Sequence, residues 1–348
     1  MTPSPTLAAR PARDIVAPTL RFLFAAAVVA LALAPFWAGR ADLRLLMEAL
    51  SFLALAQMWN LLAGFTGLIS VGQQAWVGLG GYLLFALTMF VGLPPLAAIP
   101  AAAVVAGLLA IPTGWIAFRL RGPYFAIGTW VIADVFRLVA AQVGALGGGS
   151  GISLPVEIAK SLGSSKDSRE MVMYYLAFAI GLASVLTVWL LLRSKWGLAL
   201  TAIRDSEAAA ESVGVMTRQV KFLIYVLTAG FTGLAGAFIF LQKLRITPDA
   251  AFSVNEWTAY VIFIVVIGGI GSIEGPILGV VVFFTLRQIA ADWGSWYPIL
   301  MGVIAIAVML INKRGLWGAI RAWGDIAVFP VSRTLAVTPM RSKADVRG

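Results

Sequence analysis

Apolar stretches that are each long enough to cross a lipid bilayer constrain the fold of this chain more than any other feature. A helix that spans the hydrocarbon core needs about 20 consecutive, mostly apolar residues. Such stretches occur at 20–38, 44–63, 72–92, 95–117, 123–143, 171–192, 219–242, 257–292 and 296–312. The stretch 257–292 is long enough for two helices, and we expect a break at Gly271–Pro276. The sequence therefore predicts an all-α, polytopic membrane protein of about ten transmembrane helices.

The composition fits a membrane environment and weakens most enzyme interpretations. Of the 348 residues, 60% are hydrophobic and 12% are charged, whereas soluble domains carry about 25% charged residues. The chain contains no Cys and no His. Disulfides and thiolate metal sites are thereby excluded, and the commonest metal ligand and general base is missing. We expect neither a metal site nor a catalytic residue.

The first stretch has one property of a secretory signal peptide, because Ala32-Leu33-Ala34 resembles a cleavage site. It is, however, longer than the apolar part of such a peptide, and further spans follow it. We expect it to remain in the protein as a transmembrane helix.

The Lys and Arg residues predict the orientation of the chain. The net charge is +10, but the charges lie in short segments between spans, so we expect no nucleic-acid partner. With the N-terminus inside, 17 of the 26 Lys and Arg residues face the cytoplasm, seven face outward and two lie within spans. This bias predicts that both termini are cytoplasmic. The expected organisation is a tail at 1–19, a transmembrane domain at 20–312 and a basic tail at 313–348, disordered past about Phe329.

The loop 193–218, which this orientation places inside, is predicted to contain a short helix. Asp205 or Ser206 can cap its N-terminus, Glu207 is favourable near the positive end of the helix dipole, and Gly214 favours termination of the helix. A rigid helix between two spans could dock a partner, or it could be a solvated loop helix without one. The residues alone favour neither reading.

Glu207-Ala208-Ala209 followed by Gly214 resembles the EAA-type coupling loop of ATP-binding cassette (ABC) importer permeases. Further stretches resemble the M-type subunit of the branched-chain amino acid permease family, in family order from about residue 44 to 318. They are Asn60–Gly67, Ser70–Ala75, Arg119–Ala126, Ala202–Asp205, Gly268–Ser272, Gly275-Pro276 and Arg314–Gly318. One departure is Gln73, where many family members carry His.

The resemblance implies a type II-like ABC importer permease fold in the bacterial inner membrane and a set of partners. These are a homologous second permease, two cytoplasmic ATPase subunits and a periplasmic binding protein that docks on 144–170 and 243–256. The ATPases would contact Arg204, Asp205, Glu207, Ala208, Ala209 and Gly214. The substrates would be branched-chain amino acids, although related permeases carry urea, short amides or other amino acids.

No phosphate-binding loop occurs in the chain. The Gly-rich stretch 147–151 lacks the Gly-Lys-Ser/Thr ending of such a loop, and the charge bias places it outside. We therefore expect no cofactor in this subunit, with ATP and Mg²⁺ bound by separate ATPases.

Polar residues near expected helix breaks are candidates for a translocation pathway. Glycines at 64–67 and 78–81 flank the start of the third span and suggest a helix broken at membrane depth, where irregular backbone survives only inside protein or along a wet cavity. Gln73 and Gln74 would then line the pathway or cap the broken helix. Asp134 and Arg137 share one face of a span and form either a structural ion pair or part of the pathway. Asn60 and Tyr124 complete the candidate set.

Gly271, Gly275 and Gly279 lie four residues apart, a spacing that lets helices approach closely. We expect packing within the subunit rather than a dimer seam, and the break at Gly271–Pro276 would interrupt the ridge. Two rival functions remain. An ion-coupled secondary transporter would need a relay of buried carboxylates or His, and a membrane-embedded enzyme would need a nucleophile with a base.

Overall fold

The computed structural model describes residues 13–163, 165–290, 296–312, 314–324 and 328–329. The disorder expected past Phe329 concerns residues that lie outside this description, as does most of the expected N-terminal tail. Almost every described element is a helix. The helices are α1 (Arg13–Ala32), α2 (Ala34–Trp37), α3 (Arg40–Asn60), α4 (Gln73–Met89), α5 (Pro95–Ala117), α6 (Pro123–Gln142), α7 (Val156–Lys160), α8 (Lys166–Arg193), α9 (Lys195–Asp205), α10 (Glu207–Ser212), α11 (Thr217–Lys243), α12 (Pro248–Ala251), α13 (Tyr260–Gly268), α14 (Glu274–Ile289), α15 (Trp296–Ile311) and α16 (Gly315–Gly324).

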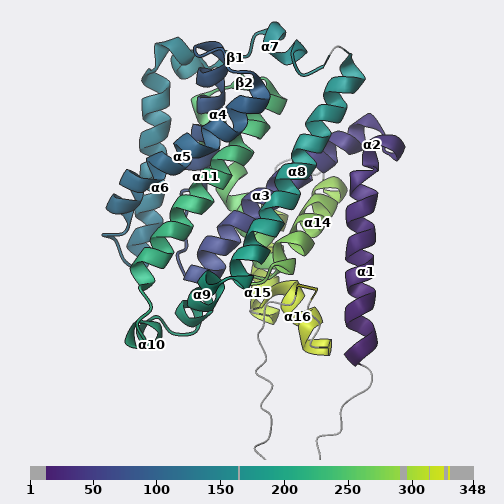
Figure 1. Cartoon of the computed structure of the whole chain (residues 1–348), viewed down its shortest axis with the longest axis vertical. Helices are drawn as coiled ribbons and strands as arrows, with labels where there is room; N and C mark the ends of the chain where they lie inside the picture. Colours follow the sequence, from purple (N-terminus) through teal and green to yellow (C-terminus); the bar gives the residue numbers. More distant parts are fainter. Residues whose placement is uncertain (1–12, 164, 291–295, 313, 325–327, 330–348) are drawn as a thin grey trace, which may run out of the picture.

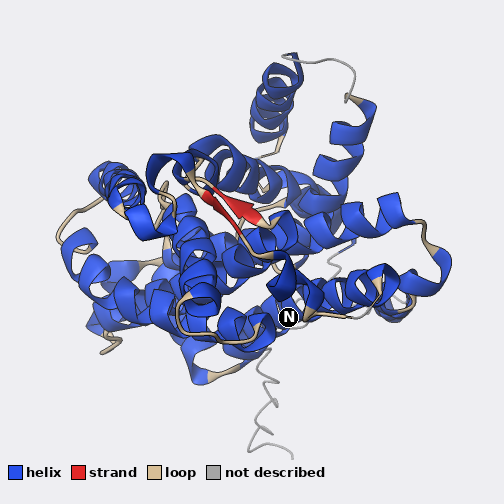
Figure 2. Ribbon diagram, turned by 90° about the horizontal axis from the view of Figure 1, so that it is seen from above, coloured by secondary structure: helices blue, strands red, loops and turns tan. Residues whose placement is uncertain are grey.

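Four short turns of other helix types accompany them. Two are π-helical, η1 (Leu61–Phe65) and η4 (Asn255–Ala259), and two are 3₁₀ turns, η2 (Gly144–Leu146) and η3 (Gly148–Ser150). The short strands β1 (Ile152–Ser153) and β2 (Arg245–Ile246) pair antiparallel, with Ile152 opposite Ile246. Figure 2 shows this ribbon lying across the helices of the bundle.

Seven helices in the described part of the chain are long and apolar enough to cross a membrane. They are Arg40–Phe65, Pro95–Ala117, Pro123–Gln142, Lys166–Arg193, Thr217–Lys243, Pro248–Gly268 and Ile299–Ala322. The other three expected spans fall on α1, whose apolar part is Thr19–Ala32, on α4 with 17 residues and on α14 with 16 residues. The ten expected stretches thus coincide with helices, of which seven are both long and apolar enough to span.

The break expected at Gly271–Pro276 begins slightly earlier. Helix α13 ends at Gly268 and α14 begins at Glu274, so the turn comprises residues 269–273. Pro276 lies in the first turn of α14, where its missing N–H needs no partner. Within the turn, Gly269 has φ +130° and Gly271 has φ +76°, which residues with a Cβ rarely adopt.

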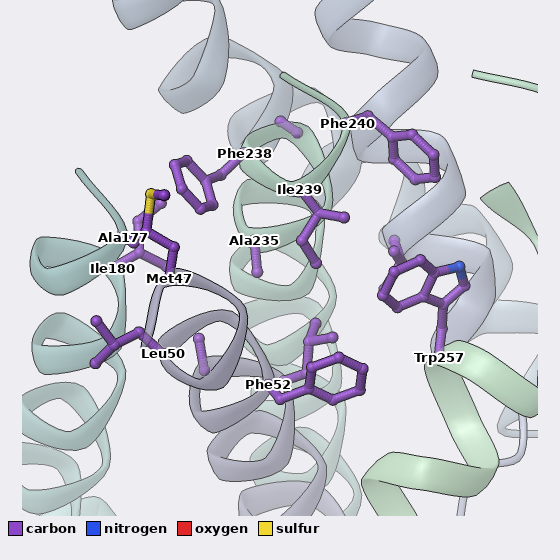
Figure 3. Packing of buried hydrophobic residues seen from close by; sticks show 14 of the residues in the cluster. Met47, Leu50, Phe52, Ala177, Ile180, Ala235, Phe238, Ile239, Phe240 and Trp257 are labelled. Atoms are coloured by element: carbon purple, nitrogen blue, oxygen red, sulfur yellow. The ribbon is translucent and has the colours of Figure 1, made fainter. Parts of the chain in front are cut away.

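The centre of the bundle is formed by α3 and α11, whereas α5, α6 and α15 lie at its periphery. Figure 3 shows how Met47 and Phe52 of α3 and Phe238 of α11 fill the space between the central helices. Lipid tails are as apolar as these side chains, so close backbone approach has to add stability. A Cβ at Gly80 of α4 would lie 2.0 Å from the carbonyl oxygen of Gly233 on α11. Glycine at this position is what permits α4 and α11 to touch.

The two ends of the bundle differ in what they carry. Figure 1 shows α9, α10 and α16 at one end, together with the start of α1, and α7, β1 and β2 at the opposite end. We call the first the α10 end (residues 193–218 and 314–324) and the second the α7 end (residues 144–163 and 244–247). The basic segments at 193–218 and 314–324, which the charge bias assigns to one side of the membrane, do lie at one end.

Candidate functional site

A helix that starts deep inside the bundle forms the first part of the candidate site. Helix α3 ends in the π-helical turn η1 at Phe65, and α4 begins only at Gln73. The intervening loop folds back along α3, because the Trp59 indole N–H donates to the carbonyl of Ser70 at 2.9 Å. Gly72 packs directly against the backbone of Thr129 on α6. The helix break expected from the glycines at 64–67 is therefore present. Its two ends, at Thr66 and at Ser70 and Gly72, are buried, whereas Gly67 and Ile69 are exposed.

Gln73 and Gln74 lie side by side in the chain at the start of α4, and both are buried. The Gln73 amide donates to the Thr232 hydroxyl at 2.9 Å, and Thr232 lies near the middle of the 27-residue helix α11. The Thr258 hydroxyl donates to the Gln74 side-chain oxygen from the π-helical turn η4. Three helices thus place uncharged polar groups around one buried N-terminus. π-Helical turns such as η1 and η4 are frequent at functional sites.

The Asn60 side chain is bonded to the turn between α13 and α14. Its amide nitrogen donates to the carbonyl of Ser272 at 2.8 Å, and its oxygen accepts from the N–H of Gly271 at 2.8 Å. One turn earlier on α3, the Gln57 amide donates to the carbonyl of Ile273 at 2.8 Å. Both the nitrogen and the oxygen of the Asn60 side-chain amide are therefore hydrogen-bonded to the turn. This arrangement favours a structural role for Asn60 over a role in the pathway.

Replacing Asn60 by Leu is expected to destabilise the protein by about 3 kcal/mol, because it leaves the N–H of Gly271 and the carbonyl of Ser272 without partners. Ser51→Ala on the same helix is the matched control, since the Ser51 hydroxyl bonds only to Met47 one turn away. Thermal unfolding in detergent measures both variants. Equal midpoints for the two would mean that Asn60 does not hold the turn.

Asp134 and Arg137 form an ion pair on α6 at 2.8 Å, and Arg137 also reaches Asp249 of α12 at 3.1 Å. The side chains are not enclosed: Arg137 is 33% exposed and Asp134 is 54% exposed. Exposed charges on a spanning helix are costly against lipid. This face of α6 therefore needs a cover other than lipid tails, either a partner protein or water.

Tyr124, the remaining candidate, lies in the first turn of α6 and is exposed. The structure does not join it to the other candidates by any hydrogen bond among the described residues. The break and the charged face are nevertheless neighbours, because the ring of Trp76 on α4 contacts the ring of Phe136 on α6, with centroids 5.9 Å apart.

The α10 segment, residues 206–216, is the second part of the candidate site. Ser206 caps α10, accepting from the N–H of Ala209 at 3.3 Å, and Gly214 turns the chain after the helix with φ +88°. Two contacts fix α10 to α11: Lys221 pairs with Glu207 at 2.7 Å, and the Thr217 hydroxyl donates to Glu211 at 2.6 Å. The segment is thus a rigid extension of the central helix α11.

The outer surface of this segment carries apolar side chains that nothing covers within the described chain. Val213 is 78% exposed and Met216 is 64% exposed, and Ala208 and Ala209 are exposed beside them. Arg204 and Asp205, also predicted for docking, form an ion pair with each other at 3.5 Å at the end of α9. Apolar groups exposed on a rigid knob at the end of a bundle suit a protein contact.

The three glycines predicted to pack helices occupy two different settings. Gly275 and Gly279 lie on α14. A Cβ on Gly279 would lie 2.0 Å from the carbonyl oxygen of Ile264 on α13, and a Cβ on Gly275 would lie 2.0 Å from that of Gly269 in the turn. Gly271 lies in the turn before α14. The three therefore form no continuous ridge, because the helix begins after the first of them.

Three site residues were missed by the sequence reasoning, namely Thr232, Thr258 and Asp249. Each is the partner of a candidate that the sequence did identify. Thr residues within apolar spans are common, and Asp249 follows a span end, so no local signal distinguishes them. Only a three-dimensional contact joins Gln73 to a residue 159 positions away.

Comparison with known proteins finds similarity to import permeases. The family described as "Branched-chain amino acid transport system / permease component" matches residues 42–312. The chain is 27% identical over 317 residues to the high-affinity branched-chain amino acid transport system permease protein LivM of Escherichia coli, covering 84% of this chain and 74% of that protein.

The chain has the same identity, 27% over 317 residues, to LivM of Salmonella typhimurium, covering 85% of this chain and 74% of that protein. The fructose import permease protein FrcC of Rhizobium meliloti is 24% identical over 280 residues, which is 77% of each chain. No solved structure gave a significant match.

Proposed function

The chain belongs to the branched-chain amino acid transport permease family, and on that premise we propose that it is the pore-forming permease subunit of an ABC importer that carries branched-chain amino acids across the bacterial inner membrane. The family is one of multi-pass membrane permeases. The observation that carries the proposal is the α10 segment, a rigid knob with exposed apolar residues at one end of an apolar bundle. A permease driven by separate ATPases needs such a docking element.

The proposed assembly follows from the two ends of the bundle. The α10 end faces the cytoplasm, where two ATPase subunits dock on α10 and bind ATP and Mg²⁺. The α7 end faces outward and receives a binding protein that delivers substrate. A homologous second permease completes the complex. Support for this orientation comes from the Lys and Arg bias of the loops, and this subunit itself is proposed to bind no cofactor and no nucleic acid.

The contacts of α11 suggest how movement at the ATPases reaches the pathway. Glu207 and Glu211 tie α10 to the first turns of α11. Further along the same helix, Thr232 holds the Gln73 amide at the buried break. A displacement of α10 is therefore transmitted by a continuous helix to the N-terminus of α4. The mechanism needs no chemical step in this subunit.

The second permease is proposed to cover the charged face of α6. Asp134, Arg137 and Asp249 together carry one net negative charge, and they are too exposed to face lipid tails at low cost. Between two permeases they would border an aqueous pathway. An amino acid zwitterion crossing there would meet both signs of charge, and the amides of Gln73 and Gln74 deeper in the bundle.

Gln73 gives a test of the pathway assignment. Gln73→Leu is expected to lower leucine uptake about tenfold, because one polar contact to the moving substrate is lost. Thr232→Val removes the same hydrogen bond from the other side while keeping the amide. It is expected to lower uptake less than Gln73→Leu does, because the backbone contact between Gly80 and Gly233 still joins α4 to α11. Uptake of labelled leucine by cells measures both. An equal loss in the two variants would assign Gln73 to capping of α4.

The substrate class is tested by deletion and competition. Cells that lack this chain should lose high-affinity uptake of labelled leucine, and unlabelled isoleucine and valine should compete in cells that have it. Urea and short amides are the alternative substrates, because related permeases carry them. Both are therefore included as competitors. Competition by acetamide but not by valine would replace the branched-chain assignment.

An ion-coupled secondary transporter is the alternative from another class. Such a protein would need a buried acidic residue that can gain and lose a proton or bind a cation. Asp134 is the candidate, and the structure pairs it with Arg137 at 2.8 Å. A carboxylate that is already neutralised by a guanidinium is poorly suited to carry a coupling ion, so this observation favours the importer.

A further inference from the structure

Three arginine side chains surround one pocket at the α10 end. The pocket has a volume of about 690 Å³ and is lined by Arg204 of α9, by Arg314 and Arg321 at the two ends of α16, and by the turn before α14. No acidic residue is among the described residues that line it. Arg204 also pairs with Asp205 at 3.5 Å. Three guanidinium groups around one cavity offer several hydrogen-bond donors to a single anion.

The position of Arg314 is fixed by glycine contacts. A Cβ on Gly315 would lie 2.6 Å from the Cα of Gly269, so the start of α16 lies directly on the turn between α13 and α14. A Cβ on Gly318 would lie 2.2 Å from the Cβ of Arg314, so the side chain occupies space that only glycine leaves open. The Asn312 side chain also accepts from the Arg314 N–H at 3.0 Å. The pocket is therefore preorganised.

The helix that leads into the pocket indicates the source of the anion. Leu310 and Ile311, the last residues of α15, are 80% and 86% exposed, and Ile306 is exposed one turn earlier. Such a face suits acyl chains, and Arg314 follows it within three residues. A guanidinium group can donate two parallel hydrogen bonds to the oxygens of one phosphate. Basic clusters at the end of a transmembrane helix attract anionic headgroups.

We propose that this pocket binds the phosphate of an anionic phospholipid whose acyl chains lie along α15. The headgroup would join α16 to Arg204, which lies directly before the α10 segment. The lipid would thus set the position of the docking segment relative to the turn that Asn60 holds. Arg314 and Arg321, unlike Arg204, lie outside the residues predicted to contact the ATPases.

Native mass spectrometry of the full chain tests the proposal. The protein is released from nanodiscs of phosphatidylglycerol and phosphatidylcholine in equal parts, and the retained phosphatidylglycerol is titrated. The double variant Arg314→Gln with Arg321→Gln is expected to bind it about thirtyfold more weakly, at about fivefold for each arginine. The matched control is Arg119→Gln with Arg218→Gln, two arginines that line a separate groove. That control is expected to retain the lipid.

Four results would overturn the proposal. Equal weakening in both double variants would indicate diffuse surface attraction, and no weakening in either would show that the pocket holds no lipid. Free phosphate would be the ligand if the wild-type protein retains no lipid and inorganic phosphate stabilises it, while phosphate does not stabilise the pocket variant. Loss of ATPase association with unchanged lipid retention would assign the arginines to a protein partner.

Two further measurements support the test. Because the three arginines are exposed, their substitution by Gln should leave the thermal midpoint unchanged, and circular dichroism checks this. Gly318→Val keeps all three charges but displaces the Arg314 side chain. It is expected to weaken phosphatidylglycerol binding at least fivefold, and unchanged binding would contradict the preorganised pocket.

Discussion

Leucine uptake should fall at least about thirtyfold when Val213 is replaced by Lys. The Val213 side chain is 78% exposed at the end of α10, and in the proposed complex it is buried against an ATPase subunit. Placing a charge in that contact should cost at least about 2 kcal/mol of docking energy, the cost typical of a central interface residue. Because Val213 makes little contact within the subunit, the folding of the permease itself should be unchanged. Co-purification of the ATPases measures the loss directly.

The matched control is Val156→Lys, which places the same charge on an exposed valine of α7 at the opposite end. It should keep the ATPases bound, whatever its effect on delivery of substrate. If the Val213 variant purifies with a full complement of ATPase subunits, α10 is a solvated loop helix and the docking assignment is incorrect.

Replacing Gly80 by Ala should strongly lower the stability of the bundle. The new Cβ would lie 2.0 Å from the carbonyl oxygen of Gly233, which is far inside van der Waals contact. Helices α4 and α11 must then separate, at a cost of about 3 kcal/mol. Since α11 also carries Thr232 and the α10 segment, we expect loss of uptake together with a low yield of folded protein.

Gly107→Ala provides the comparison, because a Cβ there would lie 3.7 Å from the nearest atom, the Cα of Gly230. This methyl group fits an ordinary contact between α5 and α11 and should change the thermal midpoint little. Thermal unfolding of both variants in detergent decides the matter. Similar midpoints would show that α4 and α11 are not in direct backbone contact at Gly80.

Elements whose cause is local could be predicted from the sequence. The apolar stretches coincide with helices, and the break near Gly271–Pro276 is present because glycines with positive φ shape the turn. The short helix in the loop 193–218 was predicted with two possible caps, and the structure selects Ser206. In each case the residues that specify the element lie within a few positions of it.

Features that depend on distant partners could not be predicted in this way. The role of Asn60 depends on the backbone of residues 271 and 272, and the environment of Gln73 depends on Thr232. Arg137 was expected either to form a structural ion pair with Asp134 or to belong to the pathway. The structure shows that pair and adds Asp249 from another helix. Hydropathy patterns record which residues are apolar, but not which spans lie side by side.

The helix count shows the same limit. Ten stretches were expected to span, and seven helices in the described part of the chain are both long and apolar enough to do so. Helix α4 comprises residues 73–89, whereas the expected stretch was 72–92. Phe90 and Val91 extend the apolar pattern past the end of the helix, because hydropathy records apolar character and not backbone conformation.

We propose that ATP hydrolysis by partner subunits drives transport through this chain. The most direct test reconstitutes into vesicles the complex purified through a tag on the C-terminal tail, and measures uptake of labelled leucine delivered by its binding protein. We predict uptake that requires ATP on the side of α10 and is unaffected when ionophores abolish ion gradients. Leucine uptake by this chain alone, without ATP and dependent on an ion gradient, would contradict the importer and establish a secondary transporter.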